Sequence, residues 1–249
     1  MNVSFAFFII SFVMHINNNN LPKKILSWYD NNQRTLPWRI SKKSKKKQYY
    51  RLLSEFMLQQ TQVKTVIPYF KKFVKKIPSL KILSKSKQKR VLKLWEGLGY
   101  YSRAINLHKT SKILVKKYNG KIPESFVELK KLPGIGDYTA NILLALIYNE
   151  PRIAIDGNVR RVLHRIFNKY NDDATNLFKT DRNDDLAEAL MEFGSLICKP
   201  KDPKCFECKI KKMCKYYSSE IKIKPKRKIK IQLKSYDIFC YLKKSKKNK

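Results

Sequence analysis

Four of the five cysteines lie within 17 residues of one another, with the spacing C-x6-C-x2-C-x5-C. Four thiolates can complete the coordination of a [4Fe–4S] cluster or of one zinc ion. Zinc sites usually use two close cysteine pairs, and the outer gaps here are too wide for two such pairs. The spacing therefore favours a [4Fe–4S] cluster over zinc or uncoordinated thiols, with the ligands Cys198, Cys205, Cys208 and Cys214. The remaining Cys240 is interpreted as an ordinary apolar residue.

Two carboxylates stand out because acidic residues are scarce. Glu55 lies in an apolar stretch with helical spacing, where burial would raise its pKa and let it act as an acid. Asp156 follows Ile153 to Ile155 and precedes a predicted helix. The plain alternatives are an exposed glutamate on a solvated face and a simple helix N-cap. One acid and one fixed carboxylate on separate helices is the minimum set for cleaving a glycosidic bond through an oxocarbenium-like state.

The segment Leu132-Pro133-Gly134-Ile135-Gly136 separates two predicted helices, 126–131 and 138–149. Glycines before a helix N-terminus let backbone N–H groups approach a phosphate closely. The pattern indicates a helix-hairpin-helix, which grips a nucleic-acid backbone without reading its sequence. An ordinary helical turn is the alternative.

The composition agrees with a polyanionic partner. Lysine and arginine number 55 against 19 acidic residues, a net charge of +36, and each phosphate neutralised on binding releases counterions. A+T-biased coding that inflates lysine throughout the chain is the alternative explanation. The sequence has no dinucleotide fingerprint, no P-loop and no C-x3-C-x2-C radical motif. A cluster is therefore expected to be structural, or a sensor of DNA contact, rather than an electron-transfer catalyst.

The elements that position these residues are predicted to be helices joined by short Gly/Pro turns, so the body is expected to be all-α. The apolar spacing indicates helices around residues 25–29, 50–68, 70–77, 88–95, 103–118, 126–131 and 138–149. Strand-like alternation is confined to Ile221–Leu242. The apolar run Phe5–Val13 lacks a basic flank and a cleavage site and is too short to cross a bilayer. It is interpreted as part of an N-terminal extension, residues 1–20, or as the result of a mis-chosen start, with a membrane-attached segment as the alternative.

Taken together, these segments resemble the endonuclease III superfamily of DNA glycosylases, most closely its adenine-removing branch, the MutY family. The resemblance covers roughly residues 21–217. It lies in residues 36–39 (LPWR), 54–63, 95–103 (WEGLGYYSR), 106–108, 132–140 and 156–163, and in the cysteine loop.

The resemblance implies a base-flipping enzyme with a two-lobed, all-α helix-hairpin-helix glycosylase fold. Residues 41–153 would form a six-helix barrel, and residues 21–40 with 154–219 the iron–sulfur cluster domain. Glu55 would protonate adenine, Asp156 would stabilise the sugar cation and Asn158 would support Asp156. Tyr138 stands where bifunctional relatives have a lysine nucleophile, and tyrosine cannot form an imine, which implies a monofunctional enzyme.

The resemblance also implies three groups of binding residues. The adenine pocket would use Arg34, Trp38, Arg39 and Glu188. The residues wedged into the base stack would be Gln59 and Tyr100, and Gln60 would be a further substrate-binding residue. The DNA backbone would be held by Leu132, Gly134 and Gly136. The implied partner is double-stranded DNA with adenine opposite 8-oxoguanine or guanine, bound by a monomer that is cytoplasmic, nucleoid-associated and bacterial, without membrane attachment.

Two departures from the family pattern stand out. The stretch between Leu163 and Met191 is shorter than expected, and residues 220–249 would supply only a remnant of the family's Nudix-like C-terminal domain. An endonuclease III-type glycosylase and lyase for oxidised pyrimidines is the closest rival. A non-catalytic, cluster-bearing DNA-binding protein is the rival from another class.

Overall fold

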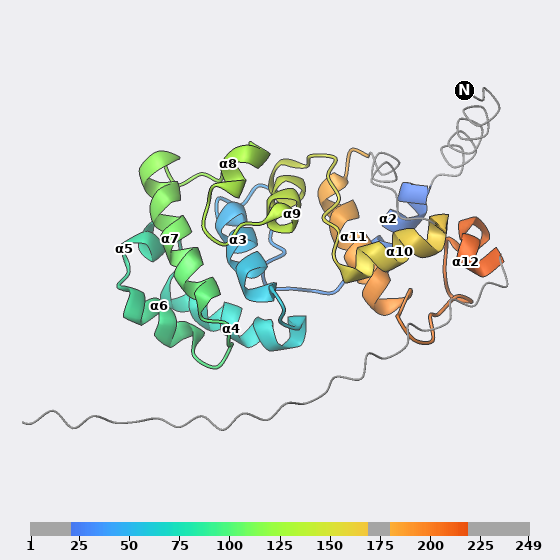
Figure 1. The fold of residues 1–249 in the computed structure, drawn as a ribbon, viewed down its shortest axis with the longest axis horizontal. Helices are drawn as coiled ribbons and strands as arrows, with labels where there is room; N and C mark the ends of the chain where they lie inside the picture. The colour runs from blue at the N-terminus through green and yellow to red at the C-terminus, as the bar shows by residue number, and fades with distance from the viewer. Residues whose placement is uncertain (1–20, 169–179, 219–249) are drawn as a thin grey trace, which may run out of the picture.

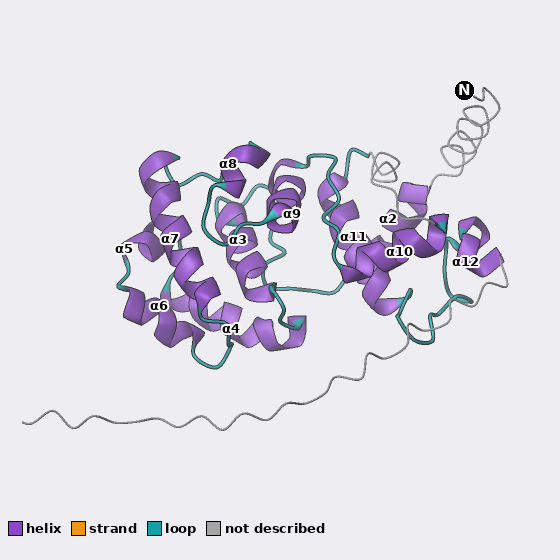
Figure 2. Ribbon diagram, viewed as in Figure 1, coloured by secondary structure: helices purple, strands orange, loops and turns teal. Residues whose placement is uncertain are grey.

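The computed structural model describes residues 21–168 and 180–218. The apolar run at 5–13, part of the stretch between Leu163 and Met191, and the segment 220–249 with its expected strand lie outside these residues. The described residues form helices and loops without a strand, as Figure 2 shows, which confirms the all-α expectation. None of the described helices has the length and apolar character needed to cross a bilayer.

The first lobe surrounds one long hydrophobic core. Its helices are α3 (Lys47–Leu58), α4 (Val63–Lys76), α5 (Leu80–Lys85), α6 (Gln88–Trp95), α7 (Ser102–Lys117), α8 (Phe126–Lys130) and α9 (Asp137–Tyr148). Figure 1 shows α3 inside this lobe, with the other six helices around it. Phe56, Phe70, Phe73 and Trp95 are fully buried in its core. Burial of large aromatic surfaces dominates the stability of such a core.

The second lobe is built from both ends of the described chain. It contains α2 (Leu21–Asn32), α10 (Gly157–Phe167), α11 (Asn183–Leu196), the short 3-10 helix η2 (Lys211–Met213) and α12 (Lys215–Ser218). Its own hydrophobic core joins α2, α10 and α11 and reaches the cysteine loop. The chain passes to the first lobe early, because Leu36 and Trp38 already pack in the first lobe's core.

Short-range signals in the sequence explain where several helices begin and end. Ser79 and Ser125 cap α5 and α8 by accepting hydrogen bonds from the N–H groups of Ile82 and Glu128. The helices α9 and α10 end at Asn149 and Asn168, which adopt left-handed backbone conformations with φ of 58° and 59°. Asparagine tolerates this conformation better than other side chains do, so it can end a helix where glycine is absent.

Two features differ from the sequence-based expectation. The helical face expected over residues 50–68 is two helices, α3 and α4, separated by a turn at residues 59–62 in which Gln60 has a φ of 56°. The helices α5, α11 and α12 and the 3-10 helix η2 fall in segments for which no helix was predicted. A turn that uses glutamine in the left-handed region has no signature in composition, because glycine and asparagine are its usual markers.

The lobes meet where α9 packs against α11. A small apolar cluster fills this junction, contributed mainly by α9 and also by Ala154 and Ala187. Gly194 in α11 also lies against the start of α10, where an added Cβ would come within 2.7 Å of the Asn158 Cβ. This close packing holds the α10 N-terminus against α11, which itself packs on α9 of the first lobe.

Candidate active site

A cleft of about 1070 Å³ lies between the lobes. Its lining includes every non-cysteine site residue that the sequence predicted except Leu132, which is buried beneath the hairpin. The predicted residues brought together here are Arg34, Trp38, Arg39, Glu55, Gln59, Gln60, Tyr100, Gly134, Gly136, Tyr138, Asp156, Asn158 and Glu188. They come from six separate parts of the chain, so the fold itself assembles the candidate site.

Glu55 is one of the few acidic side chains in the first lobe's interior. It lies on the buried face of α3, with 8% of its surface exposed. Burial raises the pKa of its carboxyl to about 7, with Arg51 opposing the shift and Glu188 adding to it. A carboxyl with that pKa holds a proton in a large fraction of molecules at neutral pH, which is the requirement for a general acid.

Tyr138 lies between the two predicted catalytic carboxylates. Burial raises the pKa of its phenol well above the usual range, and the negative charges of Glu55 and Asp156 raise it further. Its hydroxyl donates a hydrogen bond to the Met191 Sδ at 3.3 Å. The tyrosine is therefore a neutral group within electrostatic reach of both carboxylates.

Asp156 is the N-cap of α10, as the simplest interpretation of the sequence expected. Its Oδ1 accepts from the Val159 backbone N–H at 2.7 Å, and its Oδ2 accepts from the Asn158 amide at 2.9 Å. Arg161 in turn donates to the Asn158 Oδ1 at 2.9 Å and to the Cys198 carbonyl at 2.8 Å. The carboxylate is thus fixed in orientation beside a helix N-terminus, where partial positive charge favours an anion.

A buried ionic network forms one wall of the cleft. Glu188 accepts from Arg51 Nη1 at 2.7 Å, from Arg39 Nε at 2.8 Å and from the Tyr29 hydroxyl at 3.2 Å. Glu192 pairs with Arg39 at 2.7 Å and with Arg34 at 3.1 Å. Burial alone would raise the pKa of Glu188, but the two arginines bonded to it outweigh burial and lower it. Glu188 is therefore ionised, and each of the two glutamates is shared between two arginines.

Trp38 is the remaining member of the predicted adenine pocket. It is almost fully buried, and its ring meets Phe70 edge-on with centroids 5.3 Å apart.

The residues predicted to wedge into the base stack lie at the rim of the cleft. Gln59 donates to the Gly134 carbonyl at 3.2 Å, and Tyr100 is 61% exposed.

The hairpin before α9 has the geometry that the glycines predicted. Gly134 has a φ of 80°, and a Cβ there would come within 2.8 Å of both Phe56 and Asn106, so only glycine fits. Gly136 is the N-cap of α9 and brings no side chain to its first N–H groups. These groups lie at the cleft edge, available to a phosphate.

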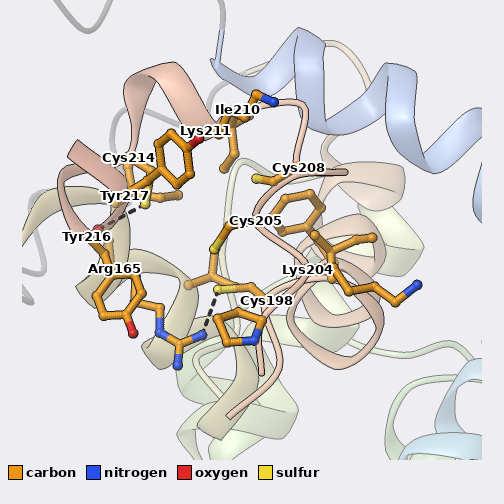
Figure 3. Close-up of a pocket in the computed structure, with 15 residues that line it drawn as sticks. Arg165, Cys198, Lys204, Cys205, Cys208, Ile210, Lys211, Cys214, Tyr216 and Tyr217 are labelled. Carbon is orange, nitrogen blue, oxygen red and sulfur yellow. Dashed lines mark hydrogen bonds between the residues drawn. The ribbon is translucent and has the colours of Figure 1, made fainter. Parts of the chain in front are cut away.

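The four cysteines line one pocket in the second lobe, as Figure 3 shows. Arg165 donates to the Cys198 Sγ at 3.3 Å and to the Lys199 carbonyl at 2.6 Å, and its guanidinium lies over the Tyr216 ring. Among the described residues, no three Cys, His, Asp or Glu side chains converge closely enough for a single metal ion. The thiols therefore surround a shared space rather than a point.

Sequence reasoning missed several residues of the site. Arg51 and Glu192 belong to the ionic network, Arg161 supports Asn158, and Met191 holds Tyr138. A usable signal existed for two of them. Arg51 precedes Glu55 by four residues on a helix, and Glu192 follows Glu188 by four, so each pair shares one helix face.

Comparison with known families decides what kind of protein presents this site. Residues 53–184 match the family described as HhH-GPD superfamily base excision DNA repair protein, and this match spans half of the chain. The chain belongs to this superfamily. The match includes Glu55, the hairpin, Tyr138 and Asp156, and it ends before the cysteine loop.

Curated relatives refine this placement within the superfamily. Adenine DNA glycosylases of Buchnera aphidicola are 44% identical over 78% of this chain (strain Bp) and 38% identical over 88% of it (strain Sg). The mouse adenine DNA glycosylase is 36% identical over 78% of the chain. The resemblance to the MutY family is confirmed. The chain spans 57% and 66% of the length of the two bacterial relatives.

Solved structures confirm the fold. A thermostable thymine-DNA glycosylase superimposes with a TM-score of 0.73 at 25% identity, covering 82% of this chain and 98% of the other. A non-covalent endonuclease III–DNA complex superimposes with a TM-score of 0.64 at 20% identity, covering 80% and 94%. The two-lobed architecture is thus that of the helix-hairpin-helix glycosylases.

Proposed function

We propose that this protein is a monofunctional adenine DNA glycosylase, which hydrolyses the N-glycosidic bond of adenine opposite 8-oxoguanine or guanine. The observation that supports it best is the arrangement around the cleft. A buried carboxyl with a pKa of about 7 lines the same cleft as a carboxylate fixed at a helix N-terminus, and a neutral tyrosine senses both. Two carboxyl groups in different ionisation states are the requirement for acid-assisted glycoside hydrolysis.

Glu55 is the general acid in this mechanism. Its carboxyl donates a proton to N7 of an extruded adenine, which makes the base a better leaving group. The electron pair of the glycosidic bond leaves with the base. Because burial lets the carboxyl hold a proton at neutral pH, the proton is available when the base arrives.

Asp156 acts on the sugar that the base leaves behind. Its carboxylate stabilises the positive charge that develops at C1′ until a water oxygen bonds there. The carboxylate does not have to reorient as this charge develops, because Val159 and Asn158 already donate hydrogen bonds to its two oxygens. Electrostatic stabilisation by such pre-oriented groups is commonly the largest single contribution to catalysis.

The proposal of hydrolysis without strand cleavage rests on Tyr138. A lyase needs an amine that forms an imine with the sugar, and a phenol cannot form one. Among the described residues that line the cleft, Lys64 provides the one lysine amine, and it lies on the exposed rim at the start of α4. Trapping with borohydride distinguishes the two chemistries directly.

Binding of double-stranded DNA by a monomer is the corresponding proposal for the partner. The hairpin glycines offer unpaired N–H groups to a phosphate, and Gln59, Gln60 and Tyr100 stand at the cleft rim where a base would leave the stack. Arg34, Trp38, Arg39 and Glu188 line the deeper wall, where the ionic network keeps the pocket's shape.

We further propose a [4Fe–4S] cluster on Cys198, Cys205, Cys208 and Cys214. The four thiols line one pocket of the second lobe, and four thiolates can complete the coordination of such a cluster. When bound, the group would cross-link α11, the following loop and the segment before α12. The Cys198 carbonyl and thiol are already held by Arg161 and Arg165.

Single-turnover assays on a duplex oligonucleotide with adenine opposite 8-oxoguanine test the activity. We expect adenine release without strand cleavage until alkali is added. Glu55→Gln is expected to abolish release while DNA binding stays within a few-fold. Glu124→Gln, an exposed glutamate away from the cleft, is the matched control and is expected to keep the wild-type rate.

The two rival functions predict different results in the same assay. Release of an oxidised pyrimidine together with a borohydride-trapped covalent adduct would establish the endonuclease III-type activity instead. Tight binding of the duplex with no base release by the wild-type protein would establish a non-catalytic DNA-binding protein.

A further inference from the structure

Arg103, the second residue of α7, lies at the meeting point of two turns. Only 6% of its surface is exposed. Its Nη1 donates to the Met57 carbonyl at 2.7 Å and also to the Phe56 and Gln59 carbonyls. Its Nη2 donates to the Leu98 carbonyl at 3.3 Å and to the Gly99 carbonyl at 3.1 Å. One guanidinium therefore joins the C-terminal end of α3 to the turn that precedes α7.

The partners of this guanidinium are carbonyls and rings rather than carboxylates. No acidic side chain among the described residues forms an ion pair with it, and it lies over the Trp95 and Tyr100 rings at 5.6 and 5.4 Å. The last carbonyls of a helix lack intrahelical partners, and a cation there is favoured by the helix dipole. A lysine ammonium cannot reproduce this planar set of bonds.

Both turns that Arg103 holds contain unfavourable backbone conformations. Gln60 has a φ of 56° and Tyr100 a φ of 47°, and neither is a glycine. Such conformations persist only when the surrounding structure imposes them. Gln60 and Tyr100 also line the rim of the catalytic cleft, from opposite turns.

We propose that Arg103 is a positioning residue that locks these two turns into one preformed wedge, so that extrusion of the target adenine depends on it. This inference rests on the proposed glycosylase function. It separates two steps, because Glu55 and Asp156 act on a base already in the cleft, whereas the wedge acts while the base leaves the duplex.

The test compares two substrates in single-turnover assays with the full chain. One is a duplex with adenine opposite 8-oxoguanine, and the other is an oligonucleotide whose adenine is unpaired in a bulge. Since a misplacement of about 1 Å can slow a reaction about 100-fold, Arg103→Met is expected to lose about 100-fold on the paired adenine. On the bulged adenine, which has no base pair to break and is cheaper to extrude, we expect a loss of no more than about 3-fold, because the chemical groups are unchanged.

Two further variants guard against a general effect on folding. Arg90→Met is the matched control, because Arg90 also donates to a helix-end carbonyl, that of Lys76 at 2.9 Å, but lies away from the cleft. It is expected to keep wild-type rates on both substrates. Gly99→Ala leaves Arg103 intact and meets no atom within 4 Å, but it strains a turn whose φ is 76°. It is expected to reproduce the selective loss if Arg103→Met does not fold.

A 2-aminopurine beside the target adenine provides a readout of unstacking that does not require base release. We expect the fluorescence rise on binding to be lost with Arg103→Met and kept with Arg90→Met. Equal losses of rate on the paired and bulged substrates, or an unchanged fluorescence rise, would overturn the inference. A wild-type protein that unstacks the base but releases no adenine would instead refute the proposed function and leave the wedge in place.

Discussion

Replacement of Glu55 by glutamine is expected to stabilise the protein strongly at pH 8 and much less at pH 5. Burial raises the pKa of Glu55 from 4.5 to about 7, so its ionised form is less favourable in the folded than in the unfolded protein. Below pH 4.5 the carboxyl is neutral in both states. As the pH rises from 4.5 to 7, the unfolded chain ionises first and the stability falls, and above 7 the penalty is constant. Glutamine is neutral at every pH, so the variant does not lose stability in this way.

The size of the effect follows from the shift. A difference of about 2.5 pKa units corresponds to about 3 kcal/mol of unfolding free energy, at about 1.36 kcal/mol per unit. At pH 5 the same relation gives a stabilisation of the variant of only about 0.8 kcal/mol. For a chain of this size, about 3 kcal/mol raises the melting temperature by roughly 6–12 °C. This value already includes the attraction between Arg51 and the Glu55 carboxylate, which opposes the rise in pKa.

Thermal unfolding of the two proteins, followed by circular dichroism at pH 5, 6, 7 and 8, measures this difference. The variant-minus-wild-type difference isolates one residue, since all other titrating groups are shared. Exposed Glu124→Gln is the control and is expected to show no such rise. A Glu55→Gln difference of the same size at pH 5 and pH 8 would refute the assignment of a raised pKa, and with it the argument for Glu55 as the acid.

Four further outcomes are expected. The single-turnover rate of base release is expected to fall as the pH rises above about 7, because the acid form of Glu55 is lost. A rate that keeps rising to pH 9 would exclude Glu55 as the proton donor. Asp156→Asn is expected to slow base release about 100- to 1000-fold in single-turnover assays, with little change in the DNA affinity measured by gel-shift titration. A fall in the rate of base release of less than about 10-fold would contradict the role of Asp156. Gly194→Ala costs about 1–3 kcal/mol in denaturant unfolding and also slows release, because the added Cβ displaces Asn158, which lies 2.7 Å away. Anaerobic reconstitution is expected to yield four irons and four acid-labile sulfides per chain. Removal of this cluster is expected to weaken DNA binding and thermal stability more than it slows base release from DNA that is already bound. One zinc ion per chain in elemental analysis would contradict the cluster.

The parts of the site that the sequence predicted are those with short-range signatures. The hairpin glycines and the cap at Asp156 depend on neighbours within about five residues, so the spacing alone indicates the geometry. Glu55 was identifiable because it interrupts an apolar helical face, and the structure buries it there. The family resemblance then supplied roles for residues whose chemistry the spacing leaves open, such as Trp38 and Tyr100.

The parts that the sequence did not predict depend on contacts between distant segments. Arg51 and Glu188 are separated by 137 positions, and Arg103 reaches carbonyls 44 to 47 positions away. Carbonyl partners leave no trace in composition, because every residue has one. The turn at Gln60 was missed for a related reason, since glutamine rarely adopts a φ of 56° and the Arg103 guanidinium that bonds the neighbouring Gln59 carbonyl lies 44 positions away.

The chemistry requires a defined distance between two groups that belong to different lobes. Glu55 comes from α3 and Asp156 from the start of α10, so any sliding between the lobes would change their separation. Apolar contacts such as those between α9 and α11 stabilise the junction but tolerate small displacements, because burial is not directional. The pairing of Arg51 on α3 with both oxygens of Glu188 on α11 is directional, with bonds of 2.7 and 3.3 Å. Buried ion pairs add little net stability, so this network is better explained by the geometry it fixes than by the free energy it contributes.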